Sequence, residues 1–440
     1  MKRLILISAI ALASTLTAAA QGKVWSLKEC MEYAMEHNLS VRKSALVVER
    51  RQVELNSAKN SMLPGVAASG SQNFSFGRGL LEDNTYANTN TTNTSLSIGA
   101  DMPLFQGLKI KNNITLGKIS LLAATEDMEK VKNDIRTSIA AAYVQILYCE
   151  EIAAVAHRQV EIDSQQVVRL EHMYLNGKAS QAEVAAHKAA LSQSILTAVQ
   201  ADNETELAKL DLSQLLEIDS PRGLEVVKPD ISSLDLKELD TPDEIYECAL
   251  DIKPQIHSEK LRLDAAQTSI AIAKADYYPS LRLNGGLGSN YYTNSTLPSK
   301  SFFEQLGNNF SQYVGLSLNV PIFSRFSTRN NVKSAKISLS NQQLQLEETK
   351  KELFKEIQRA YYNAVASASK YESSRNAAAS ADEAFSLMKG RYENGKATIT
   401  EFNESKAQYL KAESDLAQAR YQYLYEIQLL NFHKGGEIDF

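Results

Sequence analysis

The chain has 440 residues, a formal net charge of −5, nine prolines and three cysteines. The small acidic excess and the lack of a basic block exclude nucleic acid as an expected partner. Cys30, Cys149 and Cys248 are too few and too scattered for a disulfide framework. They are interpreted either as small core residues or, for Cys30 and Cys248 alone, as a bridge between the starts of two repeats.

Residues 1–20 have the pattern of a secretory signal peptide. Lys2 and Arg3 precede an apolar run over residues 4–12, and three alanines ending at Ala20 precede the expected cleavage site. The residue directly after that site is Gln21 and not a cysteine, so a lipoprotein signal is not expected. No later run of 18 apolar residues is present, so we predict an exported protein without a membrane-spanning helix.

The mature chain is expected to begin with an amphipathic helix over residues 26–60. Ser26 followed by Glu29 is the signature of a capping box, in which each residue satisfies the other's backbone N–H. A matching helix is predicted over residues 242–274, with Pro242 at the favoured first helical position. The two helices would open two similar halves of the chain.

A change of hydrophobic period from 3.6 to 2 follows Pro64 and Pro279 and predicts strands. The four strands are expected at residues 66–76, 94–105, 281–291 and 313–323. Polar loops rich in Asn, Thr, Ser and Gly, at residues 77–93 and 294–312, would join the members of each pair. Strands of about ten residues with one apolar face suit either a half-exposed sheet or a membrane barrel.

If the strands form a membrane barrel, the need to close the sheet restricts how many chains the barrel can contain. Four strands cannot make a barrel, because a sheet in lipid has no free edge and the smallest membrane barrels use eight strands. Two, three or four chains would give 8, 12 or 16 strands, and an eight-stranded barrel is filled by its own side chains. A passage through a shared barrel would therefore need at least three chains.

Two long helical hairpins follow the strand pairs, at residues 109–216 and 328–433. Stepping from Ile114 by three and four residues gives an apolar stripe that continues to Tyr174 and recurs 218 residues later, up to Tyr392. At ~1.5 Å per residue such a helix is about 90 Å long, too long for a globular core.

These patterns divide the mature chain into two tandem repeats. The repeats span residues 21–216 and 241–440, and a connector over residues 217–240 joins them, with a possible short strand at Leu224–Val227. The fold class is therefore mainly α, with coiled-coil helical hairpins and two β-hairpins in each chain.

The sequence offers no residues for catalysis, a cofactor or a metal. His157, His172 and His187 lie 15 residues apart, which is not a whole number of helical turns, and a bend separates His187 from the other two. No nucleophile elbow, P-loop or His-Glu-x-x-His motif is present. We therefore expect neither an enzyme nor a resident cofactor.

The order of elements resembles the outer-membrane factor family of TolC-like export channels. The start Trp25-Ser-Leu-x-Glu, the Tyr-x-x-Gly turns and the two strand-to-helix junctions carry the resemblance over nearly the whole mature chain. The junctions are Met102-Pro-Leu-Phe105 followed by Asn112-Asn113, and Val320-Pro-Ile-Phe323 followed by Asn330-Asn331.

The resemblance implies a homotrimer with a shared 12-stranded barrel in the outer membrane and an α-helical tube crossing the periplasm. It also implies three further partners, namely outer-membrane lipid, a periplasmic adaptor protein and an inner-membrane pump of RND, ABC or MFS type. The expected function is a passive export duct of a tripartite efflux system. The open alternatives are a type I protein-secretion duct and a periplasmic or surface coiled-coil structural protein.

In the family the hairpin turns form the periplasmic tip, where the adaptor docks. A plain helix reversal is the alternative, because Asn-Gly alone supplies the left-handed residue that stops a helix. The residues that the resemblance assigns to docking are Tyr174, Asn176, Gly177, Lys178 and Ala179 in the first turn, and Tyr392, Asn394, Gly395, Lys396 and Ala397 in the second.

The family also narrows its periplasmic entrance with acidic side chains just beyond the turns. Glu183 and Glu401 lie six residues after their turn glycines, and Glu404 lies nine after. The family more often has Asp at these places, and its basic partner is here Ala397, which leaves the closing network open. A solvated helix face is the alternative for each glutamate.

Overall fold

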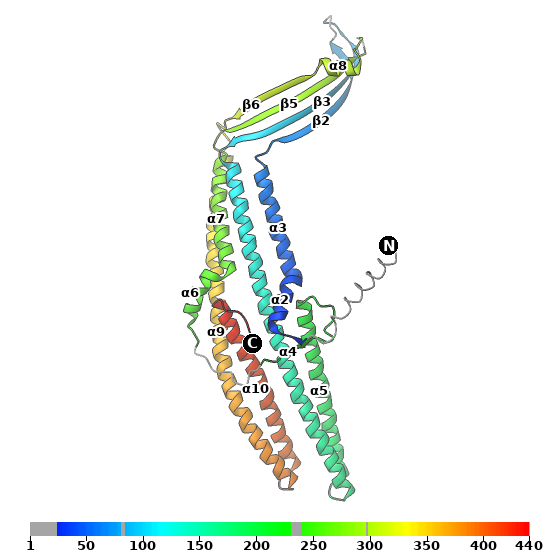
Figure 1. Ribbon diagram of the computed structural model, residues 1–440, viewed down its shortest axis with the longest axis vertical. Helices are drawn as coiled ribbons and strands as arrows, with labels where there is room; N and C mark the ends of the chain where they lie inside the picture. The colour runs from blue at the N-terminus through cyan, green and yellow to red at the C-terminus, as the bar shows by residue number, and fades with distance from the viewer. Residues whose placement is uncertain (1–23, 81–83, 230–238, 296–297, 440) are drawn as a thin grey trace, which may run out of the picture. The chain divides into compact units, whose positions relative to one another are not determined.

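The computed structural model describes residues 24–80, 84–229, 239–295 and 298–439 (Figure 1). The chain divides into two units, the first with the residues up to Leu46, 126–257 and 348 onward, the second with residues 47–125 and 258–347. The predicted signal peptide, residues 1–20, lies outside the described residues.

Each half of the chain contains the same four helices in the same order. The short helices α2 (Leu27–His37) and α6 (Pro242–Ile252) have 11 residues each, and α3 (Leu39–Asn60) and α7 (Pro254–Ala275), which follow them, have 22 each.

The long hairpins repeat with equal lengths as well. Helices α4 (Lys109–Leu175) and α9 (Ser327–Glu393) have 67 residues each, and α5 (Gln181–Leu215) and α10 (Ile399–His433) have 35 each. Equal lengths in all four pairs confirm the predicted tandem repeat of helical hairpins.

The prediction of continuous helices over residues 26–60 and 242–274 is wrong, because each is broken by one extended residue. Asn38 has a ψ of 129°, and its Oδ1 accepts a hydrogen bond of 2.8 Å from the Ser40 N–H, which begins α3. Lys253 has a ψ of 123° and precedes Pro254, whose ring disfavours helical geometry in the residue before it.

The second unit contains a four-stranded antiparallel sheet in the order β2, β3, β5, β6 (Figure 1). Its strands are β2 (Gly65–Leu80), β3 (Tyr86–Gln106), β5 (Ser280–Asn294) and β6 (Ser311–Asn319). Two hairpins distant in sequence are joined by the pairing of β3 with β5, and among the described residues the outer edges of β2 and β6 have no strand partner.

The predicted strands 66–76 and 94–105 are too short, and the loop expected at residues 77–93 is mostly strand. The ladder continues until Leu80 lies opposite Tyr86. Threonine suits a strand, and the cross-strand hydrogen bonds require no apolar side chains, so a polar sequence can extend the sheet.

The second hairpin also differs from its predicted bounds of 281–291 and 313–323. Strand β6 ends at Asn319, ahead of Pro321, which has no N–H to donate to the ladder. The region expected to be a loop, residues 294–312, contains the short helix α8 (Phe302–Asn308).

The two faces of the sheet differ in polarity, because residues paired across strands share a face. Met102, Leu283 and Leu316 form a cross-strand row on one face, and the next two rows on it contain Ala100, Gly285 and Val314, then Ile98 and Leu287. Mostly small and polar residues occupy the opposite face, in the rows Ser97, Gly288, Ser311 and Asp101, Asn284, Gly315, with Tyr313 in the row between them. Ile98, Leu287 and Leu316 are exposed within one chain, with Leu316 at 65%, and Met102 and Leu283 are half-buried.

The main core of the first unit lies where α2, α4 and α5 meet the connector. The two-residue strands β1 (Val24–Trp25) and β4 (Glu225–Val226) pair in parallel, and the Tyr143 hydroxyl lies 2.7 Å from the Val227 carbonyl oxygen and 3.1 Å from that of Trp25. Part of the predicted connector, residues 230–238, lies outside the described residues.

By length and composition alone, α4 contains one 18-residue window that is apolar enough to cross a membrane, and 56% of that window is buried inside the chain. That burial is typical of a core helix. Cys30, Cys149 and Cys248 all lie among the described residues and form no disulfide, so the bridge between Cys30 and Cys248 is absent; Cys30 and Cys149 are buried and Cys248 is exposed.

Candidate functional site

The first hairpin turn is a helix stop built on a left-handed glycine. Gly177 has a φ of +69°, the Lys178 N–H donates to the Met173 carbonyl at 2.8 Å, and the Gly177 N–H donates to the Tyr174 carbonyl at 2.9 Å. These two bonds are the Schellman pattern at a helix C-terminus. Asn176 adds a side-chain bond of 2.7 Å to the His172 carbonyl.

The second turn repeats this geometry. Gly395 has a φ of +70°, the Lys396 N–H donates to the Arg391 carbonyl at 2.8 Å, and the Asn394 side chain donates to the Gly390 carbonyl at 2.7 Å. Both Asn-Gly pairs therefore have a local structural role, whatever else they contact.

The tyrosines of the two turns have different surroundings. Tyr174 and the adjacent Leu175 are exposed, by 45% and 78%. Tyr392 instead stacks on Phe402, with ring centroids 4.7 Å apart, and lies under the Arg169 guanidinium at 5.6 Å. Burial raises the pKa of Tyr392. The repeated sequence therefore gives two chemically different tips.

The remaining tip residues differ in exposure. Lys178 and Lys396 are exposed, and Ala179 and Ala397 are half-buried. The tips therefore present basic groups to solvent in both hairpins.

Glu183 and Glu401 occupy a position that the sequence analysis missed. Each is the third residue of its helix and closes a capping box, as Glu29 does in α2. The Ser180 and Thr398 N–H groups each donate to the glutamate Oε2 at 2.7 Å. The signature Ser/Thr-x-x-Glu was present in the sequence at both places.

The capping bonds lower the pKa of both glutamates, through the backbone bond first and the side-chain bond second. Both carboxylates therefore stay ionised at neutral pH. Glu404 is exposed one turn beyond Glu401 on α10, so these two carboxylates lie on one face of the helix. Glu183 is on the other hairpin.

Three residues of α4 make polar contacts with the second hairpin within the first unit. Arg158 pairs with Glu413 of α10 at 3.2 Å, and the Arg169 guanidinium donates to the Glu393 carbonyl at the end of α9 at 2.7 Å. Between them, Asp163 forms a buried ion pair with Lys406 of α10.

The three evenly spaced histidines do not come together. His157 pairs with Asp202 at 2.9 Å, His172 is exposed, and His187 is buried. Within the described ranges, no group of three or more His, Cys, Asp or Glu side chains is placed to hold a metal ion.

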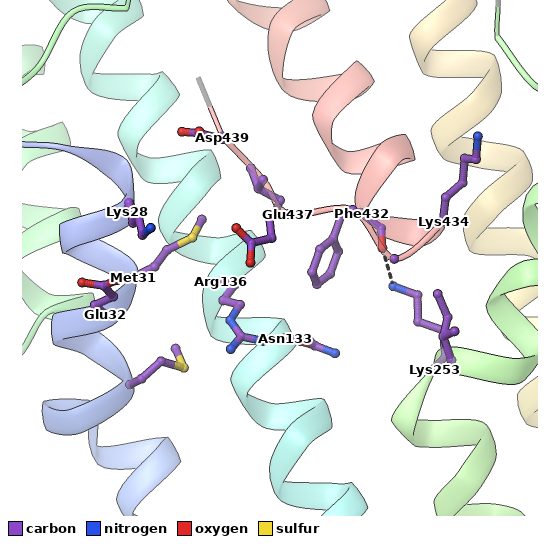
Figure 2. Close-up of a pocket in the computed structure, with 15 residues that line it drawn as sticks. Lys28, Met31, Glu32, Asn133, Arg136, Lys253, Phe432, Lys434, Glu437 and Asp439 are labelled. Atoms are coloured by element: carbon purple, nitrogen blue, oxygen red, sulfur yellow. Dashed lines mark hydrogen bonds between the residues drawn. The ribbon is translucent and has the colours of Figure 1, made fainter.

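A hollow with a volume of about 660 Å³ lies beside the C-terminal segment in the first unit (Figure 2). Its lining includes Lys28, Arg136, Glu32 and Glu437, so it has both signs of charge. Figure 2 shows Lys253 bonded to the Phe432 carbonyl, at 3.1 Å.

Burial shifts two basic groups next to this hollow toward their neutral forms. It lowers the pKa of Lys253 to about 8. Burial, with the nearby charge of Lys253, lowers the pKa of His433 to about 4. Because the lining carries both positive and negative groups, the hollow has no uniform charge that would attract a charged ligand. The hydrogen bond between Lys253 and the Phe432 carbonyl stabilises the end of α10 against α6.

Comparison with known proteins gives a consistent result. The family profile described as "Outer membrane efflux protein" matches residues 31–216 and 245–432. The chain is 22% identical over 410 residues to outer membrane protein TolC of Escherichia coli, covering 91% of this chain and 80% of that protein. It is also 22% identical over 406 residues to protein CyaE of Bordetella pertussis, covering 92% and 81%.

Solved structures of channels share the fold. The structure of CusC superposes with a TM-score of 0.78 at 17% identity, covering 95% of this chain and 96% of that one. The Campylobacter jejuni CmeC outer membrane channel gives a TM-score of 0.77 at 19% identity, covering 94% and 86%.

Proposed function

The chain belongs to the outer membrane efflux protein family, and from this premise we propose that three copies of it assemble into one passive export duct. The family works as outer-membrane ducts of efflux or type I secretion systems, with a β-barrel and a helical periplasmic tube. The trimer, its partners and its lack of catalytic activity are our proposals for this chain.

The sheet is the observation that supports assembly. It has an exposed apolar face, an opposite face of small and polar residues, and unpaired edges at β2 and β6 among the described residues. In lipid, a free edge leaves backbone groups without partners at a cost of several kcal/mol each. Pairing β6 of one chain with β2 of the next, three times, closes a barrel of 12 strands without edges.

We favour efflux, with an inner-membrane pump of RND, ABC or MFS type and a periplasmic adaptor docked at the two hairpin tips. Type I protein secretion uses the same architecture, and similarity to CyaE keeps it as the second candidate. A coiled-coil structural protein accounts for the hairpins but not for the two-faced sheet.

Purification in detergent and reconstitution test the duct. We expect three chains per particle by light scattering, corrected for detergent, and discrete conductance steps in planar bilayers. A monomer that inserts stably without conducting would contradict the proposal, because its sheet edges would then be satisfied in another way.

We also propose that Glu183, Glu401 and Glu404 form an acidic periplasmic entrance. Three copies of each carboxylate around one axis attract cations. The Glu401→Gln, Glu404→Gln double variant should have lower cation selectivity and weaker block by multivalent cations in single-channel recordings. Glutamine can still serve in a capping box, so the change removes charge while keeping the helix start.

The matched control is Glu383→Gln, which removes one exposed charge from α9 of the same hairpin and should leave selectivity unchanged. If the double variant has the same reversal potential and the same block as the unmodified channel, these glutamates face the outside of the tube. A Glu401→Ala variant that alters conductance when Glu401→Gln does not would indicate the capping role alone.

A further inference from the structure

Four polar side chains are buried together where α4, α5 and α10 meet in the first unit. Asp163 of α4 is 2% exposed, Ser194 of α5 is 3% exposed, and His187 of α5 and Lys406 of α10 are 6% exposed each. Charged side chains are almost never buried this far unless they are paired. The cluster connects the first hairpin, α4 and α5, to the second hairpin through α10.

Asp163 is the centre of this cluster. Its Oδ2 accepts a hydrogen bond of 2.5 Å from the Ser194 hydroxyl, and its Oδ1 accepts one from the Lys406 ammonium. His187 lies seven residues before Ser194, on the same face of α5. One carboxylate therefore binds both its own hairpin and the other one.

Apolar residues are buried on both sides of the cluster along the helices, and its charged groups have little access to water. Ala153, Ala156, Ala198 and Ala201 form a buried group between α4 and α5 on the side away from the tips, and Val167 of α4 is buried on the side toward them. Removing one member of a buried ion pair is strongly destabilising, because the other charge is left uncompensated.

We propose that this cluster is an acid-sensitive latch between the two hairpins of one chain. At neutral pH the Asp163–Lys406 pair holds α10 against α4 and α5. Mild acid protonates His187 beside Lys406, and the added positive charge favours separation of the hairpins. The consequence for export rests on the proposed function, whereas the latch itself lies within one chain.

The charged groups acting on the His187 ring set the direction of the effect. Burial lowers the pKa of His187, and the positive charge of Lys406 lowers it further, whereas Asp163 and Glu183 act in the opposite direction. The ring is therefore neutral in the latched state. Separated hairpins expose the ring and return its pKa toward the usual value of about 6.5.

Protons therefore bind preferentially to the separated state. The latch has its full stability above about pH 6.5 and loses it as the pH falls below that value. The other contacts named above between the hairpins contain no histidine. Arg158–Glu413 is a partly exposed pair, which contributes little to stability, and Arg169 bonds a backbone carbonyl.

The distance between the hairpins tests the latch directly. Spin labels at Ala189→Cys on α5 and Gln408→Cys on α10, both exposed positions, report it in a Cys248→Ser background. Labelled chains diluted with unlabelled ones restrict the measured distance by pulsed electron paramagnetic resonance to one chain. We expect one short distance at pH 7.5 and a several-fold larger population of long distances at pH 5.0.

Two variants and a control separate the latch from general acid effects. His187→Gln, which stays neutral, should keep the short distance at both pH values, and Lys406→Met should give long distances at both. His172→Gln, at an exposed histidine of α4, should respond to acid as the unmodified chain does. If Lys406→Met fails to fold, the His187→Gln comparison still decides the question.

An unchanged distance between pH 7.5 and pH 5.0, or an equal response in His187→Gln, would overturn the latch. The measurement needs no pump or adaptor. A conducting trimer whose distance does not change with pH would therefore reject the latch and support the proposed duct. Acid-dependent separation in a chain that forms no trimer would support the latch and reject the proposed duct.

Discussion

Leu316→Arg is expected to prevent stable insertion of the protein into the outer membrane. Leu316 lies in the middle of β6 on the apolar face of the sheet, opposite Leu283. An arginine facing lipid near the bilayer midplane costs about 2–4 kcal/mol. Three copies in one barrel would therefore destabilise the assembly by roughly 9 kcal/mol, comparable to the stability of a whole domain.

Gly315→Arg is the matched control, since it places the same side chain one residue earlier, on the polar face. Gly315 lies opposite Asn284, and a side chain added there meets no atom within 4 Å. Membrane fractionation and the fraction of protein running as trimer should show a large loss for Leu316→Arg only. Equal assembly of the two variants would mean that the apolar face of the sheet is not in contact with lipid.

The helical repeat could be predicted because it is long and regular. An apolar stripe over some sixty residues outweighs local irregularities, and its recurrence 218 residues later provides a second, independent observation. The breaks at Asn38 and Lys253 each depend on one residue, and an amphipathic pattern passes through them without interruption. In the sequence, Pro254 and the capping ability of Asn38 indicate these two breaks.

The polar end of the first β-hairpin could not be predicted from alternation. Residues such as Thr89 and Asn90 continue the ladder through backbone hydrogen bonds, which leave no trace in side-chain polarity. Alternation detects a face that contacts something apolar, and it fails where a sheet continues with polar residues on both sides.

Only part of the candidate site could be predicted from the sequence. The turn glycines followed from the Asn-Gly pairs, and the capping boxes at Glu183 and Glu401 had a signature that was overlooked. The buried cluster had none, because Asp163 and Lys406 are 243 residues apart. Asp163 lies at one of the positions of the stripe that starts at Ile114, and nothing in the stripe indicates Lys406 as its partner.

Gly395→Val is expected to abolish export while the trimer still assembles. Gly395 has a φ of +70°, which is costly for any L-residue, by roughly 1–2 kcal/mol, and more so for a β-branched one. That cost is small beside the stability of a folded protein, so the chain should respond by rearranging the turn instead of unfolding. The bond from Lys396 to the Arg391 carbonyl would be lost, and the second tip would lose the shape that the proposed adaptor must recognise.

Two substitutions separate this effect from simple bulk. Gly395→Asn keeps a residue that tolerates the left-handed region and should retain most export. Gly390→Val adds the same side chain within α9, at a glycine without positive φ and with open space around it, and should also retain export. Susceptibility to a panel of dyes, detergents and antibiotics, scored against deletion of the gene, measures export, and immunoblots of outer membranes measure protein level.

The same substitution at Gly177 shows whether the two tips contribute equally. Tyr392 is held by Phe402 and Arg169, so a rearranged second turn also disturbs the contacts between the hairpins, whereas Tyr174 is exposed and has fewer contacts to lose. We therefore expect Gly177→Val to reduce export less than Gly395→Val. Normal export by Gly395→Val at a normal protein level would mean that the turn is only a bend, and that the adaptor binds elsewhere on the hairpins.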